Sequence, residues 1–224
     1  MPVTDRLAPD PASAVSVIGD GAAVMVGGFG NAGIPFGLLH ALADQGTRDL
    51  TIISNNAGEG ESGIARLLQR GQVRKMICSY PRTPGSVWLQ RRYQAGEIEL
   101  EVMPQGTLAE RMRAAGAGLG GFFTPTGYGT MLAEGKETRM IDGRGHVFET
   151  PLPADYALIR AETGDAWGNL SYHATARNFN PVMAMAARHS IAEVRQFSET
   201  PLNPEHVITP GIFIQRLCVV EARP

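Results

Sequence analysis

The chain has 224 residues, of which 43% are hydrophobic and 19% are charged, and its formal net charge at pH 7 is −2. A chain of this length and composition folds as an ordinary globular protein with a sizeable core. Its weak, scattered charge provides no basic face for nucleic acid. No apolar run approaches the ~18 residues of a membrane span, and the first residues do not resemble a signal peptide. We therefore expect a cytoplasmic protein that binds neither nucleic acid nor membrane.

The first half of the chain alternates between apolar, β-branched runs and amphipathic segments. This pattern predicts strands over 22–26, 50–54, 73–80 and 98–103, and helices over 35–45, 61–70, 86–95 and 107–115. Gly46 and Gly71 follow helical patterns, as C-cap glycines do, and TLAE (107–110) has the pattern of a capping box. Strands that alternate with helices form βαβ units. We therefore expect an α/β fold with a largely parallel open sheet and flanking helices.

The second half of the chain changes character. The turn signals DGRG (142–145) and PLP (151–153) separate short strand-like runs. A helix is predicted within 177–190, a strand over 190–197 and a last strand within 211–222. We expect these elements to form a mixed or antiparallel extension of the sheet, with residues 1–224 making a single domain.

Residues that often carry metal or nucleophilic chemistry are scattered. Cys78 and Cys218 form no C-x-x-C pair and lie in apolar runs, which is typical of small buried side chains in a reducing compartment. The five histidines have neither metal-ligand spacing nor a nearby cysteine, so no metal site is expected. GTMLAEGKET (129–138) has five residues between its glycines, one more than a phosphate-binding P-loop, and is interpreted as a plain loop.

VMVGGFGNAGIP (24–35) contains the order G-x-G-x-x-G between a predicted strand and a predicted helix. A dinucleotide site also needs an acid at the end of the second strand, and the chain has Asn55 and Asn56 there. The glycines still let a ligand approach the backbone, and the next helix is expected to offer unpaired N–H groups. The loops after the first, second and fourth strands should meet at one edge, rich in amides and suited to an acyl carbonyl. Alternatively, Asn55 and Asn56 simply form a turn.

Several spaced motifs together resemble the α subunit of class I CoA transferases. They are DGAAVMVGGFGNAGIP (20–35), LTIISNNAG (50–58), PQGTLAERMRAAGAG (104–118), FFTPTGYGT (122–130), EGKET (134–138) and ARNFNPVMAMAA (176–187). CSYPRTPGS (78–86) and ITPGIFIQR (208–216) are most similar to the members of that family that use 3-oxoadipate. Members that use acetoacetate typically carry Gly-Glu-Asn where this chain has Pro81-Arg82-Thr83.

The resemblance implies a CoA-transferase-like fold that moves CoA from succinyl-CoA to 3-oxoadipate through a glutamyl-CoA thioester, with CoA thioester as substrate and no permanently bound cofactor. In this family the nucleophilic glutamate lies in a Ser-Glu-Asn-Gly-like motif of the β subunit. This chain has no such motif, so we expect it to act only with that partner, in an αβ or α2β2 heteromer. The resemblance also implies that Gln105 directs a side-chain N–H at the thioester carbonyl. CoA and substrate are expected at Gly27, Gly28, Phe29, Gly30, Asn31, Ala32, Gly33, Asn55 and Asn56.

Other functions stay open at this point. The acceptor can be acetoacetate or another 3-oxo acid, and related folds serve as sugar-phosphate isomerases and as effector-sensing modules; an NAD-binding module is the remaining alternative. An isomerase needs an acid–base pair that none of the loop ends presents, and a sensor is normally joined to a DNA-binding segment. Arg82 can contact a distal carboxylate of the substrate or be solvated. Tyr128 can line the pocket or pack beneath glycines.

Overall fold

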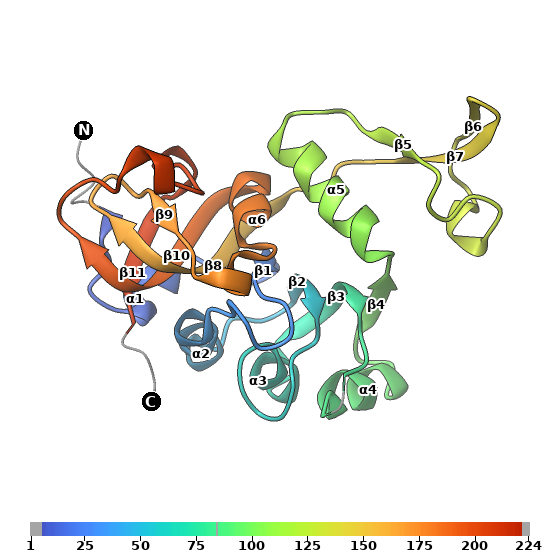
Figure 1. Cartoon of the computed structure of the whole chain (residues 1–224). Helices are drawn as coiled ribbons and strands as arrows, with labels where there is room; N and C mark the ends of the chain where they lie inside the picture. Colours follow the sequence, from blue (N-terminus) through green and yellow to red (C-terminus); the bar gives the residue numbers. More distant parts are fainter. Residues whose placement is uncertain (1–5, 84, 221–224) are drawn as a thin grey trace.

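The computed structural model describes residues 6–83 and 85–220. Figure 1 shows a twisted sheet between two layers of helices, with a separate antiparallel arm at one end. Seven strands of the sheet run parallel in the order β11-β10-β8-β1-β2-β3-β4, and the short β9 pairs antiparallel with β8. Their bounds are β1 Ala23–Val26, β2 Leu50–Asn56, β3 Val73–Tyr80, β4 Glu99–Val102, β8 Ala154–Asp165, β9 Leu170–Ser171, β10 Ala187–Ser198 and β11 Arg216–Val219. The parallel α/β sheet predicted from the sequence is therefore confirmed.

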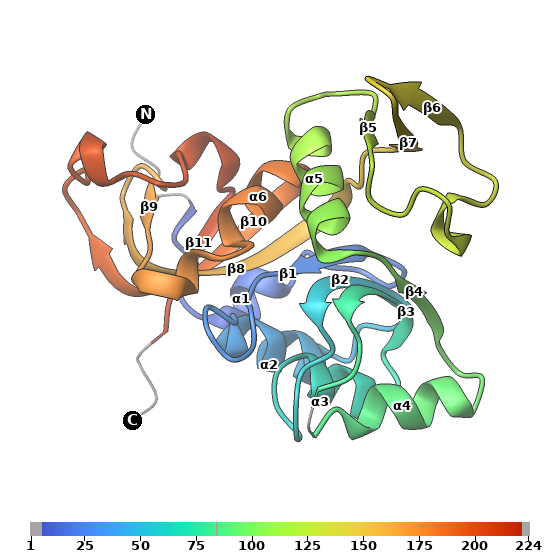
Figure 2. The ribbon, with the colours of Figure 1, turned by 45° about the vertical axis from the view of Figure 1, so that its right-hand side comes forward.

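Two helical layers cover the two faces of this sheet (Figure 2). The first layer contains α1 Pro11–Val15, α2 Phe36–Gln45, α3 Ile64–Gln69 and α4 Val87–Gln94, and the second contains α5 Gln105–Gly116 and α6 Asn180–Ala186. Because side chains alternate along a strand, Val24 and Val26 pack with the first layer while Met25 packs with the second. The hydrophobic core is thus divided into two halves by the sheet.

The predicted strands and helices of the first half all form, close to the predicted bounds. Gly46 ends α2 in the left-handed conformation, with φ +81°, as its position predicted. The capping-box interpretation of 107–110 is wrong. Helix α5 already begins at Gln105, directly after Pro104, and Thr107 is buried inside its first turn, where it cannot act as an N-cap.

The antiparallel extension is a three-stranded sheet that we call the arm, residues 122–149. It contains β5 Phe122–Thr124, β6 Thr138–Ile141 and β7 Arg144–Glu149, with the 3₁₀ helix η2 Met131–Ala133 in the loop before β6. The strands that follow the arm do not extend it. β8, β10 and β11 join the main sheet in parallel, on the side of β1 opposite β2.

The last part of the chain is irregular between its strands. Three further 3₁₀ helices are η3 Ala174–Arg177, η4 Pro204–His206 and η5 Gly211–Phe213. Because η5 occupies the start of the predicted last strand, β11 is shorter than the apolar run suggests, and predicted strand residues 221 and 222 lie outside the described residues. None of the helices in residues 6–83 and 85–220 is long and apolar enough to cross a membrane.

Candidate active site

The glycine loop, residues 27–33, follows β1 at the carboxyl edge of the sheet. Its tip is a tight turn in which the Phe29 N–H donates to the Ala32 carbonyl (3.0 Å) and the Ala32 N–H donates to the Phe29 carbonyl (3.1 Å). Gly30 occupies this turn with φ +56°, a conformation that favours glycine. The base of the loop is buried, whereas the tip is exposed to solvent. The loop therefore presents a short stretch of backbone outward from a fixed base.

Two asparagines hold the base of this loop from the side of η3 and α6. Asn178 Oδ1 accepts the Gly28 N–H (3.1 Å), and Asn178 Nδ2 donates to the Ala32 carbonyl (3.0 Å). Asn180 is fully buried, and its Nδ2 donates to the Gly33 carbonyl (3.1 Å). A side-chain amide satisfies both a donor and an acceptor of the loop backbone in this way. From the sequence these two residues were recognised only as part of a resembling motif, with no role assigned to them.

The same contacts explain two of the glycines. A Cβ built on Gly27 would overlap Asn180 Oδ1, and one on Gly33 would overlap the Ala176 carbonyl oxygen. Gly27 has no unusual φ that would call for glycine. Its requirement for glycine thus comes from close packing rather than from backbone conformation.

The N-terminus of α2 is already occupied by a buried carboxylate. Glu193 of β10 is fully buried; its Oε2 accepts the Leu38 N–H (3.0 Å), and its Oε1 pairs with Arg160 Nη1 (2.8 Å). Burial raises the pKa of Glu193, and the N–H groups of Leu38, Arg160 and Gly37 oppose that rise. The expectation of unpaired N–H groups at this helix is therefore wrong. A dinucleotide phosphate would meet the Glu193 carboxylate instead of free donors.

A second group, the amide row, lies beside the loop where β2, β3 and α5 meet. It consists of Asn55, Ser79 and Gln105. Asn55 Nδ2 donates to Gln105 Oε1 (3.0 Å) and to Ser79 Oγ (2.9 Å). Asn55 is buried, with 3% of its surface exposed, whereas Gln105 is exposed in the first turn of α5. The predicted meeting of the loops after the second and fourth strands is thus confirmed by a direct side-chain contact.

Asn56 forms the turn that the sequence left open as an alternative. Its Oδ1 accepts the Gly58 N–H (2.9 Å), which closes a turn after β2, and its Nδ2 donates to the Gly30 carbonyl (3.5 Å). Because Asn55 and Asn56 are adjacent on a strand, they point to opposite faces of the sheet. Asn56 therefore joins the second loop to the glycine loop, while Asn55 reaches Gln105.

The amide row offers hydrogen-bond donors, and within the described residues no carboxylate, imidazole or thiol hydrogen-bonds to it. No hydrogen bond within the described residues uses Gln105 Nε2. Cys78 lies next to Ser79, but burial raises the pKa of its thiol to about 12, so it is not a thiolate at neutral pH. Among residues 6–83 and 85–220, no group of three or more His, Cys, Asp or Glu side chains could hold a metal ion. Such a row can bind and polarise a carbonyl oxygen.

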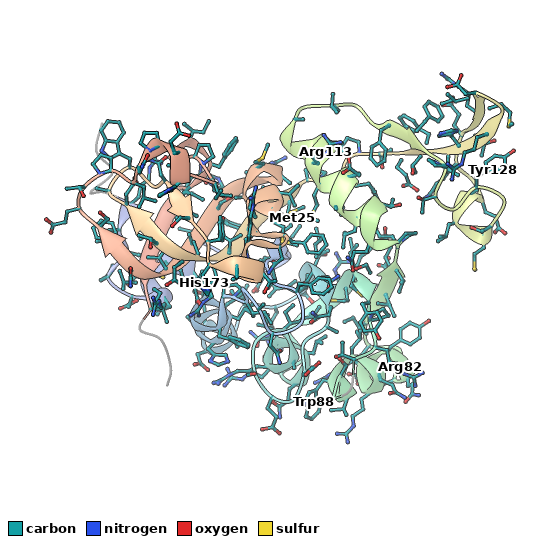
Figure 3. All side chains as sticks on the ribbon, viewed as in Figure 1. Met25, Arg82, Trp88, Arg113, Tyr128 and His173 are labelled. Carbon is teal, nitrogen blue, oxygen red and sulfur yellow. The ribbon has the colours of Figure 1, made fainter. Side chains whose placement is uncertain are left out.

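Arg82 and Tyr128, for which the sequence offered two roles each, lie in different parts of the molecule, Arg82 beside α4 and Tyr128 in the arm (Figure 3). Arg82 is exposed and lines a cavity of about 290 Å³ with Leu89 and Tyr93 of α4, on the first helical layer. Tyr128 lies in the arm, and its ring occupies the space that a Cβ of Gly145 would need. The packing alternative for Tyr128 is therefore the one that the structure supports, although the glycine it covers belongs to the arm.

The fold and the site define an open α/β protein with hydrogen-bond donors at the carboxyl ends of its strands. The fold is similar to that of glutaconate coenzyme A-transferase from Acidaminococcus fermentans, with a TM-score of 0.84 at 17% identity over 96% of this chain and 76% of that one. The family model of coenzyme A transferase matches residues 9–220, and the chain belongs to that family. The resemblance stated from the motifs is thus confirmed.

Two bacterial relatives are similar over almost their whole length. One is a subunit of the 3-oxoadipate CoA-transferase of Pseudomonas putida, 62% identical over 210 residues, which cover 93% of this chain and 91% of the relative. The other is a subunit of the succinyl-CoA:3-ketoacid coenzyme A transferase of Xanthomonas campestris pv. campestris (strain B100). It is 51% identical over 220 residues, which cover 98% of this chain and 90% of the relative.

Proposed function

We propose that this chain, a single domain over residues 1–224, is the α subunit of a heteromeric CoA transferase that moves CoA from succinyl-CoA to 3-oxoadipate. The products are 3-oxoadipyl-CoA and succinate. The observation that carries the proposal is the amide row, in which Asn55 holds the Oε1 of the exposed Gln105 and leaves Nε2 unbonded, with no described carboxylate hydrogen-bonded to the row. The 62% identity to a subunit of a 3-oxoadipate CoA-transferase supports the choice of acceptor.

The chemistry divides between two chains. A glutamate carboxylate of the partner β chain attacks the succinyl-CoA carbonyl. The CoA thiolate is expelled, and a succinyl–glutamyl anhydride forms. The thiolate then attacks the glutamyl carbonyl, which releases succinate and forms the glutamyl-CoA thioester. With 3-oxoadipate the same steps run in reverse and yield 3-oxoadipyl-CoA. Dividing one difficult transfer in this way lowers each barrier.

This chain supplies binding and electrostatic stabilisation. Negative charge develops on the attacked carbonyl oxygen in every step, and Gln105 Nε2 donates a hydrogen bond to it. The glycine loop, from Gly27 to Gly33, gives CoA and the thioester a stretch of backbone to approach, with Phe29, Gly30 and Asn31 at its exposed tip. Asn56 fixes that tip, and CoA enters as a substrate rather than as a resident cofactor.

Acetoacetate is the competing acceptor. The Xanthomonas relative, at 51% identity, is named for a 3-ketoacid in general. The difference between the two acids is a second carboxylate, which 3-oxoadipate carries and acetoacetate lacks. The proposal therefore predicts a higher kcat/KM for 3-oxoadipate than for acetoacetate in the same preparation.

The experiment measures succinyl-CoA-dependent formation of the acyl-CoA product by chromatography, for this chain and its partner β chain separately and for the two co-expressed. We expect product only from the pair, an αβ or α2β2 heteromer by light scattering, and preference for 3-oxoadipate. Product from this chain without its partner would contradict the division of chemistry. A pair that uses only acetoacetate would overturn the acceptor.

A further inference from the structure

We propose that Ser79 is a positioning residue that sets which end of the Gln105 amide faces the substrate. The inference rests on the role proposed above for Gln105 as a donor to the attacked carbonyl. An amide has one donor end and one acceptor end, so a rotation by half a turn exchanges them. Something in the site must fix the donor end outward.

The Ser79 hydroxyl determines which end of the Asn55 side-chain amide faces it. Ser79 lies near the end of β3 and is half-buried. Its Oγ donates to the backbone carbonyl of Asn55 (3.3 Å), which uses its single proton. Toward the Asn55 side chain this hydroxyl can therefore only accept, and it accepts from Nδ2 at 2.9 Å.

The orientation of the Asn55 amide in turn fixes the orientation of the Gln105 amide. With one N–H of Nδ2 on Ser79, the other N–H donates to Gln105 Oε1 at 3.0 Å. The Gln105 oxygen is thereby held inward and Nε2 is left outward. Without the Ser79 oxygen, both amides can rotate together, so that Asn55 Oδ1 accepts from Gln105 Nε2 and no bond between them is lost. The outward atom would then be an oxygen, which repels the developing oxyanion.

No other described side chain fixes this orientation. Within residues 6–83 and 85–220, Asn55 is the sole side chain that hydrogen-bonds to Gln105. Cys78 is on the opposite face of β3, in the core with the first helical layer. Asn56 is occupied by Gly58 and Gly30. The polarity of the row thus depends on Ser79.

The kinetic test uses the enzyme assembled with its partner. We expect Ser79→Ala to lower kcat about five- to tenfold, because the outward orientation of Gln105 Nε2 is favoured by one hydrogen bond, from Asn55 Nδ2 to Ser79 Oγ. KM should stay within twofold. Ser79→Thr keeps the hydroxyl and is expected to restore kcat. In a Gln105→Ala background, Ser79→Ala is expected to have no further effect, because there is no amide left to orient.

A matched control separates orientation from stability. Ser190 is buried, and its Oγ donates to the Ala184 carbonyl (2.8 Å), away from the amide row. Ser190→Ala removes a similar hydroxyl–carbonyl bond and should leave kcat within twofold of the wild type. An equal loss from Ser79→Ala with and without Gln105 would overturn the proposal, since the effect would then not pass through that amide.

A second readout does not depend on turnover. In the assembled enzyme with only this chain ¹⁵N-labelled, the side-chain amide signals of Gln105 are the pair missing from Gln105→Ala. We expect these signals to move in Ser79→Ala, to return in Ser79→Thr and to stay in place in Ser190→Ala. Unmoved signals in Ser79→Ala would refute the role of Ser79. Absence of 3-oxoadipate turnover in the wild type would refute only the proposed function.

Discussion

The glycine loop and the arm are both rich in glycine, and two glycines of each region show two different reasons for needing it. In the loop, a Cβ on Gly27 or Gly33 would overlap atoms of η3 and α6. In the arm, Gly135 and Gly143 each have φ +73° and nothing within 4 Å of a built Cβ. Gly27 and Gly33 of the loop therefore serve close packing, whereas Gly135 and Gly143 of the arm serve turns. Glycine residues in a sequence thus have at least two different structural causes, which the sequence alone does not distinguish.

The burial of the two regions follows the same division. The base of the loop is buried and held by Asn178 and Asn180. The arm exposes large apolar side chains, with Met131 79% and Met140 60% exposed. Buried side-chain hydrogen bonds thus fix the backbone at the carboxyl edge of the main sheet, where the amide row also lies. Substitutions in the two regions should therefore differ in their effects on turnover and stability.

The largest expected effect is on the amide row. Gln105→Ala should lower kcat of the assembled enzyme by ~10²–10³, because one donor to the oxyanion is lost. Its free energy of unfolding should fall by no more than about 1 kcal/mol, because Gln105 is exposed and a single hydrogen bond, from Asn55 Nδ2, is lost. Gln90→Ala, the same change at an exposed helical position on α4, is the control and should leave kcat unchanged. Unchanged turnover in Gln105→Ala would remove this residue from the site.

The second effect is the cost of a methyl group in the glycine loop. Gly27→Ala should lower the free energy of unfolding by about 1–3 kcal/mol through overpacking against Asn180. Gly143→Ala in the arm should cost about 1 kcal/mol, since only the left-handed backbone is penalised. Chemical denaturation measures both. A larger cost at Gly143 than at Gly27 would reverse the comparison between loop and arm.

The third effect sharpens the explanation of Gly27. The overlap of its Cβ is with the side-chain amide of Asn180 alone. Asn180→Ala by itself should destabilise the protein by about 1–3 kcal/mol, since it unpairs buried backbone groups, among them the Gly33 carbonyl. In that background, Gly27→Ala should cost less than ~1 kcal/mol, because the overlapping atoms are gone. Strictly additive costs in the double variant would mean that Asn180 is not what excludes a side chain at Gly27.

The smallest expected effect is the chemical reactivity of the two buried cysteines of the main sheet. Burial raises the pKa of Cys78 and of Cys218 to about 12, so at pH 8 only about one thiol in 10⁴ is ionised. We expect iodoacetamide at pH 8 to modify neither cysteine in the folded enzyme and both in the denatured chain, as measured by mass. Rapid modification of the native protein would contradict this, because it would show that the core around the main sheet exposes its cysteines to solvent far more often than their burial indicates.

The sequence predicts what depends on neighbours along the chain. The strands and helices of residues 22–116 follow from local periodicity, and the left-handed Gly46 follows from its place after a helix. Contacts between distant segments were beyond its reach. Asn178 meets Gly28 across 150 residues, and Glu193 meets Leu38 across 155. Local sequence contains no signal for such pairs, so the expectation of free N–H groups at α2 failed.

The candidate site was predictable in part. The parallel order of the first strands places Asn55 near Gln105, and the structure confirms that contact. Ser79 was not singled out, because an isolated serine at the end of a strand has no distinctive pattern. Its importance depends on the direction of one hydroxyl proton, which only the arrangement of three side chains defines.

The most direct test is to locate the covalent intermediate. The assembled enzyme is incubated with succinyl-CoA without acceptor, quenched in acid and analysed by mass spectrometry of the separated chains. We predict that a glutamate of the partner chain carries the CoA adduct and that this chain keeps its unmodified mass. A CoA adduct on this chain, for example at Glu59 or Glu61 in the loop after β2, would contradict the claim that it contributes only the donor half of the site.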